Sequence, residues 1–256
     1  MKKFIIITIV LSVFAIDNVS AQFVSASYQH IGNKIPYRVM YPKNYDASIQ
    51  YPLLVFLHGA GERGNDNEKQ LVHGEQFLID NFNVKYPAIV IIPQCPDDNY
   101  WANVQRSEID GKVEYAFGLS DEPTHSMKML TTLIDYWLAS GKVDTRKVYA
   151  GGLSMGGMGT FELLWRRPNT FAAAFPICGG TSIDKLNLYA TNTAVWIFHG
   201  DLDQVVPVQF SQKAYQILKN LGCDVRYTEY EGVKHNSWDN AFKEVELAPW
   251  LFSHSK

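Results

Sequence analysis

Four continuous apolar runs divide the chain, at residues 53–57, 88–92, 148–151 and 194–198. Each run carries apolar side chains at consecutive positions, whereas a strand with one solvated face would alternate apolar and polar residues. Strands that are apolar on both faces lie in the interior of a parallel sheet. The four runs therefore predict the central strands of such a sheet.

Stretches with helical periodicity lie between these runs. Two sets of apolar residues recur at intervals of three and four: Leu130, Leu133, Ile134, Trp137 and Leu138, and Phe210, Ala214, Ile217, Leu218 and Leu221, the second ended by Gly222. Strands and helices in alternation predict an α/β fold, in which helices cover both faces of a mostly parallel central sheet. Two strand patterns at residues 25–28 and 35–41 flank a Gly-Asn pair and predict an N-terminal antiparallel hairpin.

The segment from Pro93 to Pro123 interrupts this alternation. It is rich in Pro, Asp, Asn and Gly and has no helical period, so it predicts a long irregular loop. Four aromatic residues lie in it, namely Tyr100, Trp101, Tyr115 and Phe117. Because long loops in compact domains are often functional, we expect this segment to form one wall of a substrate site.

The N-terminal residues have the pattern of an export signal. Lys2 and Lys3 precede a short apolar run at residues 4–16, and small residues end the segment at Ala21. The run is too short to cross a bilayer of about 30 Å as a permanent helix. We expect residues 1–21 to be a signal peptide cleaved after Ala21, a secreted or periplasmic location, and a single domain at residues 22–256.

Composition narrows the possible functions. Removing the predicted signal peptide changes 23 basic and 26 acidic side chains to 21 and 25, because two lysines and one aspartate are lost. The resulting net charge of −4 argues against a nucleic-acid binder, which needs a basic face. Cys95, Cys178 and Cys223 allow at most one disulfide and leave its pairing open. No CxxC or HExxH pattern occurs, so no zinc site is indicated.

A GxSxG pattern at residues 152–156 centres on Ser154. A strand at residues 147–151 precedes it, and an apolar helical pattern that stops at Pro168 follows it. A sharp turn between a strand and a helix exposes the serine hydroxyl and leaves no room for bulk beside it. Ser154 is therefore the predicted nucleophile.

A serine hydroxyl needs a base to accept its proton and an acid to orient that base. Asp201 and Asp203 follow the strand at 194–198, and His235 follows a strand at 225–230. Ligands of open α/β sheets bind at the carboxyl ends of strands, so we expect His235 to be the base and one of the two aspartates to be the acid. The other histidines are interpreted as structural or solvated: His30, His73, His125, His199 and His254.

An acyl-transfer site also needs donors for the oxyanion, and preorganised backbone N–H groups serve best. One is expected from Met155, which follows the nucleophile. The second is expected from Ala60, in the glycine-rich loop after the strand at 53–57. His58, in the same loop, is interpreted as a scaffold residue.

Several segments together resemble secreted α/β-hydrolase esterases: LHGAGERG at 57–64, PQCP at 93–96, GLSMGG at 152–157, and the loops that carry Asp203 and His235. The subgroup is the predicted peptidase or phospholipase/carboxylesterase group, which is similar to feruloyl esterases, polyhydroxybutyrate depolymerases and dienelactone hydrolases. The resemblance implies an α/β-hydrolase fold and ester hydrolysis through an acyl-enzyme on Ser154, with no metal or organic cofactor. It also favours Asp203 as the acid over Asp201.

Substrate contacts are expected from four residues. Glu62 and Arg63 follow the glycine-rich loop at residues 58–61, which we call the oxyanion loop. Trp101 and Trp238 offer flat rings for a sugar or a phenolic acyl group. The expected partner is a small or polysaccharide-linked ester, such as a feruloyl or acetyl xylan. A peptidase or amidase of the prolyl-oligopeptidase type and a non-catalytic carbohydrate-binding relative remain alternatives. The sequence indicates no particular oligomeric state.

Overall fold

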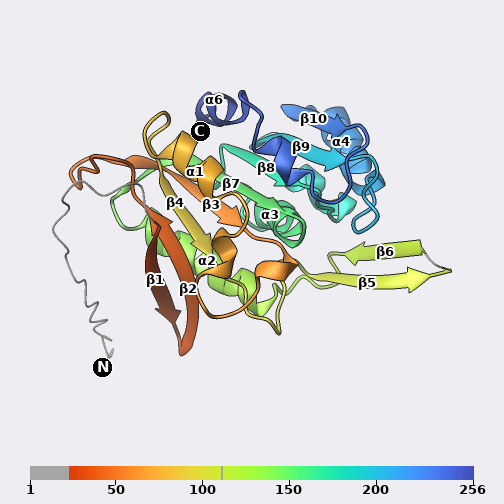
Figure 1. Ribbon diagram of the computed structural model, residues 1–256, viewed down its shortest axis with the longest axis horizontal. Helices are drawn as coiled ribbons and strands as arrows, with labels where there is room; N and C mark the ends of the chain where they lie inside the picture. The colour runs from red at the N-terminus through yellow and green to blue at the C-terminus, as the bar shows by residue number, and fades with distance from the viewer. Residues whose placement is uncertain (1–22, 111) are drawn as a thin grey trace.

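The computed structural model describes residues 23–110 and 112–256, so the predicted signal peptide lies outside the described residues. A central sheet of eight strands runs through this part of the chain in the order β1-β2-β4-β3-β7-β8-β9-β10 (Figure 1). The strands are β1 Val24–His30, β2 Asn33–Met40, β3 Tyr51–Leu57, β4 Ile89–Pro93, β7 Val143–Leu153, β8 Ala173–Ile177, β9 Ala194–Gly200 and β10 Val225–Tyr230.

The sheet is parallel from β4 to β10 and antiparallel only at its N-terminal edge. β1 pairs with β2, and β2 pairs with β4, in antiparallel register. β3 lies between β4 and β7 and runs parallel to both. The predicted α/β class, the mostly parallel sheet and the N-terminal hairpin are thus confirmed.

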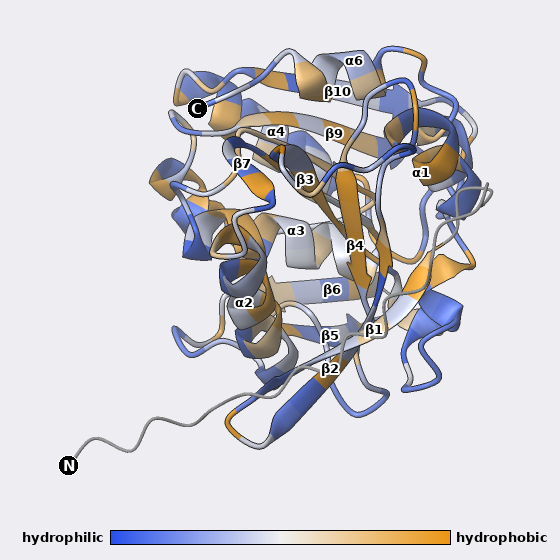
Figure 2. Ribbon diagram, turned by 90° about the vertical axis from the view of Figure 1, so that its left-hand side faces the viewer, coloured by the Kyte–Doolittle hydropathy of each residue, from blue (hydrophilic) through white to orange (hydrophobic). Residues whose placement is uncertain are grey.

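Helices cover both faces of this sheet, and β3 contributes to both layers. Leu53, Val55 and Leu57 of β3 pack in one core with apolar residues of three helices, α2 His125–Leu138, α3 Met155–Arg166 and α4 Gln209–Asn220. Leu54 and Phe56 point the other way and pack with α1 Glu75–Phe82 and α6 Leu247–Phe252. Burial on both faces explains the continuous apolar run, and Figure 2 shows β3 and β4 in hydrophobic colours at the centre.

The predicted irregular loop is wrong for residues 104–117. β5 Val104–Ile109 and β6 Lys112–Phe117 pair as an antiparallel hairpin that projects from the body (Figure 1). Most β5 side chains are exposed, so no apolar run marks the strand in the sequence. Tyr115 and Phe117 anchor the hairpin on the ring of Phe210 in α4, with ring centroids 5.9 and 5.4 Å away.

Other elements had no prediction. Helices α1 and α6 and the short helix α5 Trp238–Ala241 carry patterns too brief for a periodicity argument. The central strand β8 has a five-residue apolar pattern like that of β4, and the predictions above do not include it. All three cysteines have free thiols. Within residues 23–110 and 112–256, none of the helices has the length and apolarity needed to span a membrane.

Candidate active site

Ser154 occupies the turn between β7 and α3, with a backbone φ of 53°. Side chains other than glycine rarely adopt this conformation, and such strain concentrates at functional sites. The glycines on either side are needed for space. A Cβ atom on Gly156 would lie 1.9 Å from the Leu57 carbonyl oxygen, and one on Gly152 would lie 2.5 Å from the Gly156 carbonyl oxygen. The turn therefore presents the Ser154 hydroxyl because its neighbours carry no side chain.

The structure brings Ser154, His235 and Asp203 into one hydrogen-bonded chain. The Ser154 Oγ lies 2.9 Å from His235 Nε2, and His235 Nδ1 lies 2.7 Å from Asp203 Oδ2. Each residue follows the carboxyl end of a parallel strand, since β7, β9 and β10 end just before them. The contact to His235 is made by Asp203, so the geometry selects Asp203 over Asp201.

Asp203 is saturated with hydrogen-bond donors. Its Oδ1 accepts from the N–H groups of Val205 and Val206, at 2.8 and 2.9 Å. Its Oδ2 faces His235 Nδ1 and, at 3.1 Å, His199 Nε2. Burial on its own raises the pKa of Asp203, but the hydrogen bonds from His199 and His235 outweigh it and hold the pKa well below its usual range. The Asp203 carboxylate is therefore ionised at neutral pH.

From the sequence His199 is interpreted as structural or solvated. The structure agrees with the structural interpretation and adds a contact to Asp203 that the sequence does not indicate. The His199 side chain has no exposed surface and bridges Asp203 to the Ser211 hydroxyl, which lies 2.7 Å from its Nδ1. The signal that could have found it is its place in the second-last position of β9, four residues before the acid.

The two expected oxyanion donors lie where backbone N–H groups have no partner within their own helix. Met155 opens α3, and Ala60 opens the short helix η1 Ala60–Glu62 after β3. His58 anchors this loop. Its Nδ1 lies 2.6 Å from the Gly59 carbonyl oxygen, and its Nε2 accepts the N–H of Cys95 at 3.0 Å. These partners require a neutral ring with its proton on Nδ1, and burial lowers the pKa of His58 to about 4.

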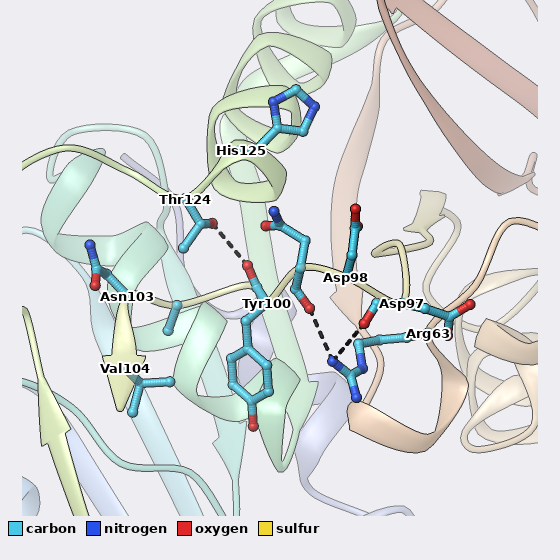
Figure 3. Close-up of a pocket in the computed structure, with 10 residues that line it drawn as sticks. Arg63, Asp97, Asp98, Tyr100, Asn103, Val104, Thr124 and His125 are labelled. Atoms are coloured by element: carbon cyan, nitrogen blue, oxygen red, sulfur yellow. Dashed lines mark hydrogen bonds between the residues drawn. The ribbon is translucent and has the colours of Figure 1, made fainter. Parts of the chain in front are cut away.

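Arg63 also holds the oxyanion loop. Its Nε donates to the Ala60 carbonyl oxygen at 3.0 Å, and its Nη1 donates to the carbonyl oxygens of Asp97 and Asn99 at 3.0 and 3.2 Å (Figure 3). It lines an open cavity of about 490 Å³ with Tyr100 and other residues of the 97–104 segment. None of the Ser154, Asp203 and His235 side chains is among the described residues that line this cavity. The guanidinium thus ties the loop to the 93–103 segment.

The remaining expected substrate contacts divide into two groups. Trp238 stands edge-on to the His235 ring, with centroids 5.4 Å apart, and also contacts His73. Glu62 is buried nearby, with its carboxylate 3.7 Å from His73 Nε2. Trp101, in contrast, has no exposed surface, and its Nε1 donates to the His58 carbonyl oxygen. The prediction that Trp101 contacts substrate is wrong, because the ring packs beneath the oxyanion loop.

The α/β hydrolases are defined by a serine in a strained turn at the carboxyl edge of such a sheet, followed along the chain by the acid and then by the histidine that contacts the serine. Ser154, Asp203 and His235 have this order and these contacts. The chain belongs to the phospholipase/carboxylesterase family, Abhydrolase_2, which matches residues 46–247.

Known proteins support this assignment. The chain is 25% identical to acyl-protein thioesterase 1 of Gibberella zeae over 224 residues, which cover 78% of this chain and 90% of that protein. It is 34% identical to a thermostable esterase of known crystal structure, with a TM-score of 0.80 over 91% of this chain, and spans 63% of that chain. A ferulic acid esterase with 17% identity and a TM-score of 0.66 matches 91% of this chain and 98% of its own, which shows the shared fold alone. The protein is a hydrolase of the carboxylesterase/thioesterase type.

Proposed function

We propose that the protein is a serine carboxylesterase that works through an acyl-enzyme on Ser154. The observation that carries the proposal is the unbroken path from Ser154 Oγ through His235 to Asp203, at 2.9 and 2.7 Å. Both distances lie in the range in which a base can take a hydroxyl proton and an acid can orient that base.

In the proposed reaction, His235 Nε2 accepts the Ser154 proton while Oγ attacks the ester carbonyl carbon. The N–H groups of Ala60 and Met155 stabilise the oxyanion. Asp203 keeps the Nδ1 proton of His235 in place and stabilises the imidazolium. His235 then protonates the leaving alcohol and later activates the water that hydrolyses the acyl-enzyme.

The proposed substrates are polysaccharide-linked esters, such as feruloyl or acetyl xylan, met by an exported enzyme. Support comes from the predicted signal peptide, which favours a substrate outside the cytoplasm. A second support is Trp238 at the catalytic histidine, where a flat ring suits a sugar or a phenolic acyl group. The net charge of the predicted exported chain also suits a neutral ester partner better than a nucleic acid.

The test assays the purified protein on p-nitrophenyl acetate, methyl ferulate, acetylated xylan, an acyl thioester and a peptide anilide, with Ser154→Ala as control. Esters should be cleaved with an initial burst of alcohol, and Ser154→Ala should lower kcat by about 10⁴-fold or more. Preference for the anilide would favour the peptidase alternative. Full activity of Ser154→Ala would refute the mechanism, and inertness towards methyl ferulate and acetylated xylan would refute the substrate class alone.

A further inference from the structure

Asp203 lies between two Ser–His pairs rather than one. On the more exposed side, His235 Nδ1 lies 2.7 Å from Asp203 Oδ2, and His235 Nε2 lies 2.9 Å from Ser154 Oγ. On the buried side, His199 Nε2 lies 3.1 Å from the same Oδ2, and His199 Nδ1 lies 2.7 Å from Ser211 Oγ. Ser211 and His199 take no chemical step in the proposed reaction. Their link to it is the contact between His199 and Asp203.

The partners of His199 fix where its protons lie. Its Nε2 faces two acceptors, Asp203 Oδ2 at 3.1 Å and the Val206 carbonyl oxygen at 2.9 Å, so Nε2 carries a hydrogen. A neutral imidazole then has a lone pair on Nδ1. The Ser211 Oγ lies 2.7 Å from Nδ1 and 3.3 Å from the Gly179 carbonyl oxygen, and we assign its single proton to the shorter contact. Ser211 therefore selects the tautomer in which His199 donates to Asp203.

The surroundings hold this arrangement rigidly. His199 is the second-last residue of β9, Ser211 lies in the first turn of α4, and both are fully buried. The titratable groups that face Asp203 from other elements are the Cys178 thiol at the end of β8 and the Tyr115 phenol of β6. Burial raises the pKa of both groups, so neither is charged near neutral pH.

We propose that His199, held in one tautomer by Ser211, is a positioning residue that sets the orientation and the basicity of Asp203. The inference rests on the proposed triad. The hydrogen bond from His199 fixes the carboxylate so that Oδ2 faces His235 Nδ1, and it neutralises part of the charge that would otherwise stabilise a protonated His235. Loss of this donor should therefore strengthen the attraction between the carboxylate and an imidazolium at His235.

The test compares His199→Leu, which removes the donor, with His199→Gln, whose amide nitrogen can replace Nε2. In full-chain protein, His199→Leu should lower kcat about tenfold, as for loss of a hydrogen bond to a charged group, with KM within twofold. The acid limb of the kcat/KM profile should move to higher pH. His199→Gln should recover most of both effects.

Ser211→Ala is the milder variant, since it removes one buried hydroxyl and leaves the ring in place. It should move the acid limb in the same direction by a smaller amount. If His199→Leu does not fold by circular dichroism, Ser211→Ala and His199→Gln decide the question. The proposal is overturned if the folded Leu variant, or the Ser211→Ala variant in its place, keeps the wild-type profile and kcat. It is also overturned if Gln is as impaired as Leu, which would indicate a packing role.

Proton NMR gives a second readout. Two ring N–H groups that donate to one buried carboxylate oxygen should give two low-field resonances, and His199→Leu should remove one and shift the other. An unshifted His235 signal would contradict the coupling. Ser154→Ala separates the two levels: if it is inactive while the His199 variants resemble wild type, the triad stands and only the positioning role fails.

Discussion

The two sides of Asp203 use the same residue types and perform different tasks. His235 is 20% exposed and follows β10 on a loop, whereas His199 has no exposed side-chain surface and lies within β9. Ser154 sits in a strained turn with the first N–H groups of α3 beside it, whereas Ser211 is buried in α4. Hydrogen bonding alone therefore does not define a nucleophile. Access for the ester carbonyl and donors for its oxyanion make the difference.

The ring orientation differs as well. His235 meets the acid through Nδ1 and turns Nε2 to the Ser154 hydroxyl, while His199 meets it through Nε2 and turns Nδ1 to the buried Ser211 hydroxyl. A proton accepted by His235 Nε2 can pass to a leaving group. One accepted by His199 Nδ1 would remain as a buried charge, which is costly.

The largest difference between the two sides should follow from His235→Ala. Loss of the general base should reduce kcat by about 10⁴-fold or more, far beyond the change from His199→Leu. Steady-state kinetics on p-nitrophenyl acetate measures the effect, and His30→Ala, on the outer strand β1, is the matched control. Comparable losses from His235→Ala and His199→Leu would mean that the two sides had been assigned wrongly.

Asp203→Asn should affect both sides at once. The amide keeps the size of the carboxylate but loses its charge. Its single oxygen cannot accept both from the two histidines and from the two backbone N–H groups, so kcat should fall by about 10⁴-fold. Asp201→Asn is the matched control, because Asp203 makes the contact to His235. If Asp201→Asn were the more impaired variant, the selection of Asp203 would be wrong.

Some features of the fold and the site can be predicted from the sequence and others cannot, for a physical reason. The apolar run at 53–57 predicts strand β3, because burial on both faces requires apolar residues at every position. Ser154 is equally visible, because the turn around it excludes side chains at Gly152 and Gly156. Such requirements are local, and they leave a local pattern.

The missed features depend on contacts between distant segments. β5 is a strand because β6 pairs with it, and its exposed polar residues carry no apolar pattern. Trp101 has the ring expected of a sugar-binding residue, yet it packs against His58, 43 positions away in sequence. His199 gains its role only when α4 places Ser211 against its ring.

His58 extends the comparison to a third histidine, which is buried like His199, through the pH dependence of stability. Burial holds its pKa at about 4, below the value of about 6.5 expected for the unfolded chain. Between these values the unfolded chain binds a proton that the folded chain excludes. The free energy of unfolding should therefore decrease as pH falls from about 6.5 to about 4, by up to about 1.4 kcal/mol per pH unit.

Urea unfolding at pH 7, 6 and 5 measures this contribution, with His58→Gln as the variant that cannot titrate. The stability difference between wild type and His58→Gln should narrow as pH falls, because only the wild type loses the His58 contribution. A difference that is constant from pH 7 to pH 5 would show that His58 binds its proton equally in both states.

The smallest effect is expected from Tyr115→Phe, which tests whether the hairpin supports the acid. The Tyr115 hydroxyl donates to the Val205 carbonyl oxygen at 3.2 Å, and the Val205 N–H donates to Asp203 Oδ1 at 2.8 Å. Removing the hydroxyl leaves the ring packed on Phe210 but frees the carbonyl end of the peptide between Val205 and Val206, whose N–H donates to Asp203 Oδ1 at 2.9 Å. Because the hydroxyl is partly exposed, the loss should be about 1 kcal/mol or less, which corresponds to a fall in kcat of about two- to fivefold.

Thermal unfolding of Tyr115→Phe separates local from global effects. If the hairpin supports the acid loop, kcat should fall while the unfolding temperature changes little, and the acid limb of kcat/KM should shift less than in His199→Leu. A variant with unchanged kcat would show that the two backbone N–H groups and the two histidines hold Asp203 without help from the hairpin. His199, held by Ser211, would then be the main contact that holds Asp203 in place from the buried side of the site.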